Sequence, residues 1–434
     1  AVEAGDWIAV RDSGETVFTG YDVTEDDVLI TKYRTIRFKG KESLQIILDK
    51  TPFYAESGGQ VGDTGYLISG SEKIEIVDTI KENNAIIHIS HGKISSPGEM
   101  FHAVVDLRKR LMTANNHTAT HLLHHALRKV LGNHVEQKGS LVTPERLRFD
   151  FSHFSRLTRH ELRKVEEEAN RMVRDSASRE TAEGVPMEEA RRMGAIALFG
   201  EKYGDTVRVV RFGDSIDLCG GTHAENTGRI GIIKITSEGG IAAGIRRIEA
   251  VTAEKAEEYI NEKIEAAEEA GALLKSTGNL RESVEKLLTE NTLLKKTIEK
   301  LEANSAVNLI KDLEGKAVTI DGLRYISGII EAGTADMLKN LAYQVRSSSD
   351  NTVLVIGASI AGKANIFVMV SDNLVDTRKI SAVEIIREIA GEIKGGGGGQ
   401  PFLASAGGKN PSGLTAALSR AEAYLRKKSS SPEG

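Results

Sequence analysis

Two histidine-containing motifs far apart in the chain, HTATH at 117–121 and CGGTH at 219–223, constrain the fold more than any other feature. The first lies in NNHTATHLLHHALRKVLG, where apolar residues recur at helical spacing, so its two histidines share one helix face. The second carries paired glycines, which favour a tight loop over a helix. Three imidazoles and one thiolate suit Zn²⁺, which prefers four nitrogen and sulfur ligands in a tetrahedron. The sequence therefore predicts one folded domain that brings together four zinc ligands, His117, His121, Cys219 and His223.

Each motif by itself supports a simpler interpretation. A lone HxxxH is more often a pair of surface or half-buried histidines, and the adjacent His124 and His125 favour that interpretation. A single cysteine is commonly a buried structural residue. Only the conjunction of the two motifs favours a metal. Zinc proteases of the HExxH type need Glu after the first histidine, and Thr118 occupies that place, which argues against protease chemistry.

Composition limits the class of protein. The chain has 434 residues, enough for about two to four domains, and its 40% hydrophobic content supports real cores. The net charge of −5 means that any nucleic acid would bind to local basic surfaces. One cysteine allows no internal disulfide and predicts a cytoplasmic location. No apolar run or signal-peptide pattern indicates a membrane partner, and the start without methionine suggests a fragment.

We expect a multidomain α+β fold with four parts. Residues 1–110 contain β-rich segments separated by Gly, Asp and Asn turns, which predict a small N-terminal β-barrel, with a sandwich as the alternative. Residues 111–251 mix helices and strands and carry the four metal ligands. Residues 252–312 are a helical segment, and residues 313–434 form a separate α/β domain.

The helical segment is rich in Glu, Lys and Leu, and STGN at 276–279 divides it into two helices, a predicted αα-hairpin. In the second helix, residues at alternating spacings of four and three form a heptad seam with one Asn inside it. The alternative is a helix that packs on its own domain. We expect a coiled coil and a homodimer contact through Leu280, Val284, Leu287, Asn291, Leu294, Ile298 and Leu301.

Two glycine-rich segments of the last domain are candidates for phosphate binding. GASIAGKA at 357–364 has the spacing of a nucleotide-binding loop, but Ala364 stands where Ser or Thr would hold Mg²⁺. A strand-like segment follows where the motif needs a helix, so we expect a β-hairpin without ATP binding. The second segment, KGGGGGQPFLASAGGK at 394–409, could be a plain linker. However, glycines beside lysine let backbone N–H groups approach phosphates, which favours a loop that contacts nucleic-acid backbone.

The motifs together resemble the editing region of alanyl-tRNA synthetases. The matching segments are TPFYAESGGQVGDTG (51–65), HTATH, QKGSLVTPERLRFDFS (137–152), CGGTH and GIRRIEA (244–250), in that order. The heptad segment and GGGGGQPFLASAGG resemble the C-terminal domain of the same enzymes, so the likeness covers nearly the whole chain. Nothing resembles the domain that activates alanine, and this chain alone is not expected to charge tRNA. A free-standing editing deacylase is the alternative.

The resemblance implies a substrate, a partner and site residues. It implies hydrolysis of mischarged Ser-tRNA(Ala) and Gly-tRNA(Ala) at the zinc site. An apolar pocket that selects alanine cannot strongly reject serine, which adds only a hydroxyl, and it always admits the smaller glycine. A second site that hydrolyses these errors is the general remedy. Thr118, Thr120 and Gln137 match motif positions and are candidates to select the serine hydroxyl, with helix packing or loop capping as the alternative. The tRNA body would bind the C-terminal domain at Lys394, Gly395, Gly396, Gly397, Gly398, Gly399, Gln400, Lys409 and Arg420.

The role of the zinc is left open by the sequence. An open zinc site activates a water molecule as nucleophile. Four protein ligands, however, close the tetrahedron, which is typical of structural zinc. A non-catalytic tRNA-binding dimer module with structural zinc is therefore a second alternative to the editing hydrolase.

Overall fold

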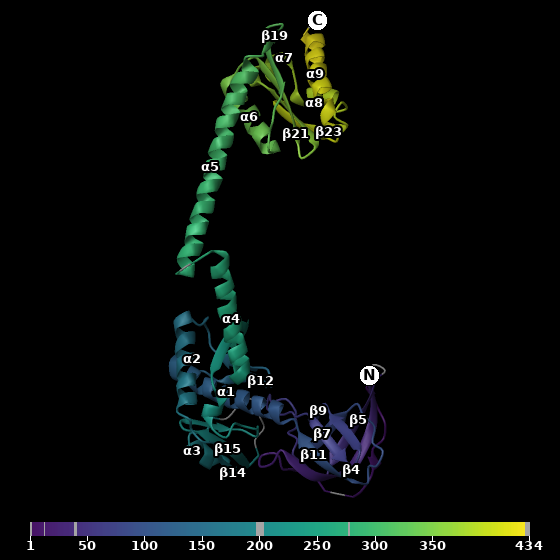
Figure 1. Cartoon of the computed structure of the whole chain (residues 1–434), viewed down its shortest axis with the longest axis vertical. Helices are drawn as coiled ribbons and strands as arrows, with labels where there is room; N and C mark the ends of the chain where they lie inside the picture. Colours follow the sequence, from purple (N-terminus) through teal and green to yellow (C-terminus); the bar gives the residue numbers. More distant parts are fainter. Residues whose placement is uncertain (1, 13, 39–40, 197–203, 277, 430–434) are drawn as a thin grey trace. The chain divides into compact units, whose positions relative to one another are not determined.

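The computed structural model describes residues 2–12, 14–38, 41–196, 204–276 and 278–429. The chain forms two compact units, Ala1–Ala270 and Gly271–Gly434, each with its own helices and sheets (Figure 1). The expected mixed α+β class is confirmed. Among the described residues, no helix is long and apolar enough to cross a membrane.

The N-terminal part of the first unit is a nine-stranded antiparallel sheet. Its strands follow the order β8-β7-β11-β4-β5-β10-β9, with β1 and β2 paired to β4. The 14-residue β4 pairs with β11 near its start and with β5 along the rest. The strands are β1 (Val2–Ala4), β2 (Ile8–Ala9), β4 (Glu25–Phe38), β5 (Lys41–Leu48), β7 (Gly65–Ser69), β8 (Glu72–Ile76), β9 (Asp78–Glu82), β10 (Ala85–Ser90) and β11 (Met100–Val105). A short parallel pair, β3 (Val17–Phe18) with β6 (Lys50–Thr51), lies outside it.

The predicted N-terminal barrel is not seen. The path of backbone hydrogen bonds through the described strands runs from β8 to β9, and no closed barrel is detected in it. β8 and β9 are joined by Val77 alone, so they follow one another along the chain and do not pair as neighbouring strands. Buried side chains such as Ile30, Leu48, Phe53 and Phe101 still form a continuous core on this sheet.

The rest of the first unit packs two helices on a four-stranded sheet. Helix α1 (Leu107–Leu131) begins at Asp106, whose carboxylate accepts from the Lys109 amide, and it ends at Gly132. Helix α2 (Arg159–Arg174) packs on it, and both cover the sheet β12 (Gln137–Val142), β13 (Leu147–Ser152), β18 (Ile245–Thr252) and β17 (Ile233–Ala242). A smaller sheet joins β14 (Glu180–Pro186), β15 (Thr206–Phe212) and β16 (Ser215–Leu218), with α3 (Met187–Arg192) beside it. The turn η1 (Thr227–Ile230) and helix α4 (Ala253–Leu273) follow.

The second unit is a six-stranded sheet with helices. The sheet follows the order β19-β20-β21-β22-β24-β23, from β19 (Val318–Ile320), β20 (Leu323–Ile329), β21 (Thr352–Ile360), β22 (Lys363–Val370), β24 (Leu403–Gly408) and β23 (Gly395–Gln400). Its helices are α5 (Leu280–Glu314), α6 (Ala335–Ser348), α7 (Asp372–Arg378), α8 (Ala382–Ile389) and α9 (Leu414–Ser429), with the turn η2 (Pro411–Gly413). Strands β21 and β22 form the hairpin expected at GASIAGKA, with Ile360 opposite Lys363.

The expected glycine-rich loop is instead an edge strand. Residues of β23 pair antiparallel with β24, from Gly395 opposite Gly408 to Gln400 opposite Leu403. Glycine permits this pairing because a Cβ on Gly397 would lie 2.0 Å from the Ser405 carbonyl oxygen. A Cβ on Gly396 or Gly398, by contrast, would meet nothing within 4 Å. Three of the five glycines are thus required by packing against β24, and two are not.

The two helices expected from the Glu/Lys/Leu-rich segment are present, and they are interrupted where STGN predicts. The C-terminal end of α5 packs on α6 and β20 through Leu309 and Leu313. The heptad seam is exposed: Leu287 is 51% and Leu294 62% exposed. A coiled coil is not evident among the described residues, because nothing covers this stripe within one chain.

Candidate metal centre

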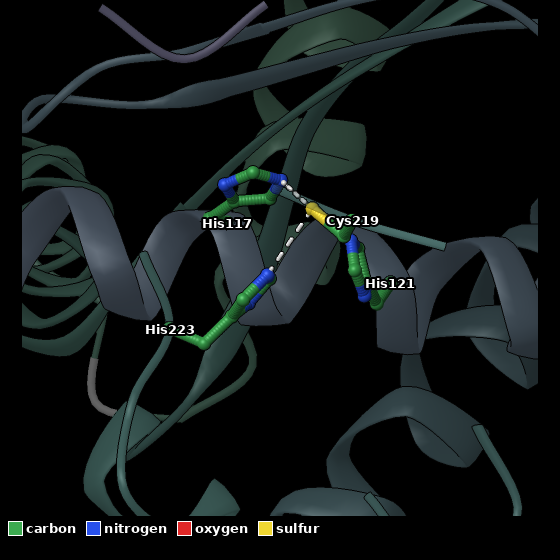
Figure 2. Close-up of side chains that lie close together, drawn as sticks. All are labelled: His117, His121, Cys219 and His223. Atoms are coloured by element: carbon green, nitrogen blue, oxygen red, sulfur yellow. Dashed lines mark hydrogen bonds between the residues drawn. The ribbon is translucent and has the colours of Figure 1, made fainter. Parts of the chain in front are cut away.

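The structure brings both histidine-containing motifs to one buried point. His117 and His121 project from one face of α1, one helical turn apart. Cys219 and His223 lie on the loop that follows β16 (Figure 2). The Cys219 sulfur lies 3.3 Å from Nε2 of His117 and 3.3 Å from Nε2 of His223. One ligand atom from each of the four residues lies within 4.8 Å of the others, and all four side chains are buried.

The distances and the chemistry of this cluster fit a tetrahedral zinc site. With Zn–N about 2.1 Å and Zn–S about 2.3 Å, neighbouring ligand atoms lie about 3.3–3.6 Å apart. The two sulfur–nitrogen distances of 3.3 Å are close to that spacing, and the four ligand atoms as a set lie within 4.8 Å of one another. Three imidazoles and one thiolate are a ligand set typical of zinc, and they fill its tetrahedron when all four bind.

Gln60 orients His117. The amide oxygen of this fully buried glutamine lies 2.7 Å from Nδ1 of His117 and accepts from the Thr222 amide at 3.0 Å. Because the oxygen can only accept, Nδ1 carries the proton and Nε2 is free to face Cys219. The Gln60 amide group donates to the Thr222 hydroxyl at 2.8 Å, so both motifs are fastened to one residue of the N-terminal sheet region. Such outer contacts fix the tautomer of a ligating histidine.

The other two histidines have oxygen partners behind them as well. The Thr118 hydroxyl lies 3.1 Å from Nδ1 of His223 and accepts from the Ala224 amide at 3.1 Å. Nδ1 of His121 lies 3.3 Å from the carboxylate of Asp217, which is itself buried and accepts from Ser215. Each imidazole therefore presents Nε2 to the cluster and turns Nδ1 toward an oxygen.

The electrostatics of the cluster favour a thiolate. Burial by itself would raise the pKa of the Cys219 thiol, but the three surrounding imidazoles lower it well below its usual range. Burial lowers the pKa of His223 to about 3, so its ring is neutral. Burial opposes charge on His121 too, yet Asp217 and the Cys219 thiolate raise its pKa to about 10. The Cys219 thiolate and the neutral His223 ring are already in the form that binds zinc, whereas His121 would release a proton when the metal binds.

The CGGTH loop is shaped by its glycines and held by two side chains from other elements. Arg208 donates to the carbonyl oxygens of Cys219 and Gly221 at 3.0 and 3.1 Å. The guanidinium stacks 3.9 Å above the Tyr21 ring, whose hydroxyl donates to the Gly220 carbonyl. A Cβ on Gly221 would lie 2.1 Å from Cε1 of His117, so only glycine fits against that ring.

The three candidate substrate-selecting residues have different surroundings. Thr118 is fully buried behind His223, and Thr120 donates to the Asn116 carbonyl of its own helix at 2.8 Å. Gln137 starts β12, is half-buried, and donates to Ser140 at 3.4 Å. Ser140 in turn donates to the Gly58 carbonyl, two residues before Gln60. Of the three, only Gln137 keeps a partly accessible side chain.

The candidate tRNA-contacting residues all lie in the second unit. Lys394 and all six residues of β23 are exposed, and the outer edge of this strand has no neighbour among the described strands. Lys409 is also exposed, directly after β24. Arg420 lies on α9, where its guanidinium pairs with Glu388 and Glu392 at 2.9 Å each. These pairs neutralise Arg420, which weakens the prediction that it binds phosphate.

Three family models match the chain. A model of the threonyl and alanyl tRNA synthetase second additional domain matches residues 207–249, which include Cys219 and His223. A model of class II (A) tRNA synthetases matches residues 6–109, and one of the DHHA1 domain matches residues 322–427. An alanine–tRNA ligase of Cytophaga hutchinsonii is 45% identical over 428 residues, 98% of this chain and 49% of that protein. The ligase of Bacteroides fragilis is 48% identical over 97% of this chain and 48% of its own length.

The chain is similar to alanyl-tRNA synthetases over nearly all of its length. It spans about half the length of the curated relatives that it matches, and it corresponds to their C-terminal half. A solved structure, the C-Ala domain of alanyl-tRNA synthetase from Aquifex aeolicus, is 30% identical. That domain matches 26% of this chain and 98% of its own, with a TM-score of 0.24.

Several residues around the metal centre were missed from the sequence. Gln60 lies in the SGGQVGD part of the first quoted motif, but glutamine has no metal preference that would have marked it. Asp217 lies on β16, two residues before Cys219, which directly follows this strand. Residues two apart in a strand point to the same face, so the strand pattern could have placed both side chains together. Tyr21 and Arg208 stand in segments without any motif signal.

Proposed function

We propose that this chain is the editing and tRNA-binding part of an alanine–tRNA ligase, which hydrolyses mischarged Ser-tRNA(Ala) and Gly-tRNA(Ala). The observation that carries the proposal is the buried cluster of three histidines and one cysteine, with an oxygen partner behind each imidazole, in a chain similar to alanyl-tRNA synthetases. Zinc is the proposed metal, held by His117, His121, Cys219 and His223. A cytoplasmic location is part of the same proposal.

Bound zinc would either polarise the aminoacyl ester or hold the loop that shapes the site. Gln137 is the residue that we propose to recognise the serine hydroxyl, because its amide group is partly accessible while Thr118 and Thr120 are engaged inside. Thr118 would position His223, and Gln60 would position His117. The ester is already reactive, so placement of the substrate supplies much of the rate.

The first experiment measures deacylation of Ser-tRNA(Ala), Gly-tRNA(Ala) and Ala-tRNA(Ala) by the whole chain and its variants. We expect rapid loss of serine and glycine, and a stable alanyl ester. Cys219→Ala should abolish hydrolysis and zinc binding. Because that variant can also lose its fold, Gln137→Ala is measured beside it and should slow the seryl ester more than the glycyl ester with full zinc content. No hydrolysis of any ester by folded, zinc-loaded protein would refute the editing activity.

A second candidate function is a non-catalytic tRNA-holding dimer module with structural zinc. The closed set of four buried protein ligands favours it, since catalytic zinc usually keeps one open position. This candidate predicts that Cys219→Ala lowers the unfolding temperature of the first unit while tRNA(Ala) binding by the second unit persists. We propose that β23, with Lys394 and Lys409, contacts the tRNA backbone, and that the seam of α5 forms the homodimer contact.

A further inference from the structure

A hollow of about 720 Å³ lies between the start of α2 and the edge strand β17 of the first unit. Six of the twelve residues that line it are charged: Arg156, Arg159, Arg163, Glu166, Lys234 and Glu238. None of these residues takes part in the candidate metal centre.

The acidic side chains of the hollow are already neutralised from within the protein. Glu166 pairs with Lys234 at 2.7 Å and also accepts from the Ile235 amide at 2.9 Å. Glu238 pairs with Arg246, whose Nε donates to it at 2.6 Å. The two carboxylates therefore contribute little net charge to a ligand in the hollow.

The three arginines, in contrast, have no such partner. Arg156, Arg159 and Arg163 are exposed, and none of them makes a hydrogen bond or ion pair with another described residue. The first turn of α2 is satisfied by its own capping box, in which Thr158 and Glu161 bond each other's backbone amides. The attraction for an anion thus comes from three guanidinium groups that can each form paired hydrogen bonds with phosphate.

An exposed aromatic side chain directly precedes this basic cluster in the chain. Phe154, two residues before Arg156, is 90% exposed. Its ring lies by the turn between β17 and β18, where a Cβ on Gly244 would be 3.5 Å from it. A fully exposed phenylalanine gains nothing from burial within this chain. An exposed ring beside arginines is the arrangement that stacks a nucleobase while the charges follow its backbone.

We propose that Arg156, Arg159, Arg163 and Phe154 form an RNA-binding surface on the first unit, in which the arginines bind backbone phosphates and Phe154 stacks on a base. The identification of this RNA as a tRNA rests on the proposed function. It is separate from β23 and would give the editing core its own hold on the substrate. Its net positive charge is local, in a chain whose overall charge is −5.

The test measures binding of uncharged tRNA(Ala) transcript to the whole chain over a range of salt concentrations. The triple variant Arg156→Ala, Arg159→Ala, Arg163→Ala is compared with a control that removes three exposed lysines, Lys73→Ala, Lys81→Ala, Lys93→Ala. Each phosphate contact contributes about 0.7–0.9 to the slope of log affinity against log salt. We expect the arginine variant to lower that slope by about 2 to 3 and the lysine control to leave it unchanged.

Phe154 is tested independently. Phe154→Ala should weaken tRNA binding about 5-fold or more with no change in the salt slope, and Phe154→Tyr should retain the affinity. Equal affinity and slope for wild type, the arginine variant and the lysine control would overturn the proposal. Saturable binding of inorganic phosphate at the concentration that saturates tRNA would also overturn it, in favour of a small-anion site. The readout needs no hydrolysis, so failure of the editing proposal and failure of this surface are separate results.

Discussion

At the scale of single residues, the candidate metal centre depends on the close approach of the loop backbone to the His117 ring as much as on its four ligands. Gly221 is the clearest case, because its neighbour Gly220 provides a matched control. A Cβ on Gly221 would collide with the His117 ring and lie 2.9 Å from the Gln60 oxygen, whereas a Cβ on Gly220 would lie 3.8 Å from the Tyr21 hydroxyl. The loop therefore has room for a methyl group at Gly220 but not at Gly221.

We expect Gly221→Ala to displace His117 and to weaken zinc binding at least 10-fold, the usual effect of disturbing the partners of a ligating histidine. The measurement is zinc content and affinity by competition with a chromogenic chelator. Gly220→Ala should bind zinc like the wild type. Full zinc affinity in Gly221→Ala would mean that His117 is not a ligand.

His88 is a buried histidine outside the metal centre, and it makes the first unit sensitive to acid. Its Nδ1 donates to the Ile46 carbonyl at 3.1 Å, and its Nε2 accepts from the Thr51 hydroxyl at 2.8 Å. Burial lowers the pKa of His88 to about 4. The histidine pKa of the unfolded chain is about 6.5. Between pH ~6.5 and ~4 the unfolded chain therefore binds a proton at His88 that the folded chain does not bind.

The sign of the pH effect follows directly. The contribution of neutral His88 to the free energy of unfolding is fully present above pH ~6.5. It falls by up to about 3 kcal/mol as the pH drops from ~6.5 toward ~4. We expect the urea midpoint of the first unit to fall between pH 7 and pH 5, and to fall less in His88→Gln. His91→Gln, at an exposed position beside Ser43, is the control and should keep the wild-type pH dependence. The same pH dependence in His88→Gln would refute this assignment.

At the scale of elements, the periodic helix α1 and the GASIAGKA hairpin were predicted well, and the poly-glycine segment at 395–400 was not. A helix was expected through NNHTATHLLHHALRKVLG, and the structure places it at Leu107–Leu131, since its apolar face is a local signal. The segment at 395–400 was expected to be a loop because glycine has low intrinsic strand preference. Its pairing with β24 is decided by close backbone contact, which no local propensity reports.

The alternation of glycines along β23 yields a matched prediction. Gly397→Ala would place a Cβ 2.0 Å from the Ser405 carbonyl oxygen and should destabilise the second unit by about 1–3 kcal/mol. Gly396→Ala meets open space and should leave stability within about 0.5 kcal/mol. If β23 contacts tRNA backbone, Gly396→Ala should nonetheless weaken binding, because a methyl group separates the strand from the phosphates. Thermal unfolding and tRNA binding of both variants measure the two effects, and unchanged binding by Gly396→Ala would remove β23 from the tRNA interface.

At the scale of the whole molecule, the sequence indicated which ligands should meet but not how the site is assembled. Spacing alone made His117 with His121, and Cys219 with His223, two candidate pairs. Gln60 joins them from a third segment, and only tertiary folding brings that segment to the centre. The order of the N-terminal strands was equally beyond prediction, because it depends on which strands pair in the folded protein rather than on the pattern of any one strand.

The exposed seam of α5 leads to the prediction about assembly. Leu294 lies on the seam and is 62% exposed, while Leu293, one position away and 64% exposed, points about 100° around the helix. A surface helix with several exposed leucines in heptad register is stabilised by a second copy that buries them. We therefore expect the wild-type chain to be a dimer by light scattering at micromolar concentration.

Leu294→Glu should convert the dimer to a monomer, because it would place two carboxylates in the apolar seam of a two-stranded coiled coil. Leu293→Glu changes the same residue type at nearly the same exposure and should leave the dimer intact. Both variants should retain the fold of each unit, since neither leucine is buried within the chain. A monomeric wild type, or equal dissociation of the two variants, would show that the stripe on α5 does not join two copies of this chain.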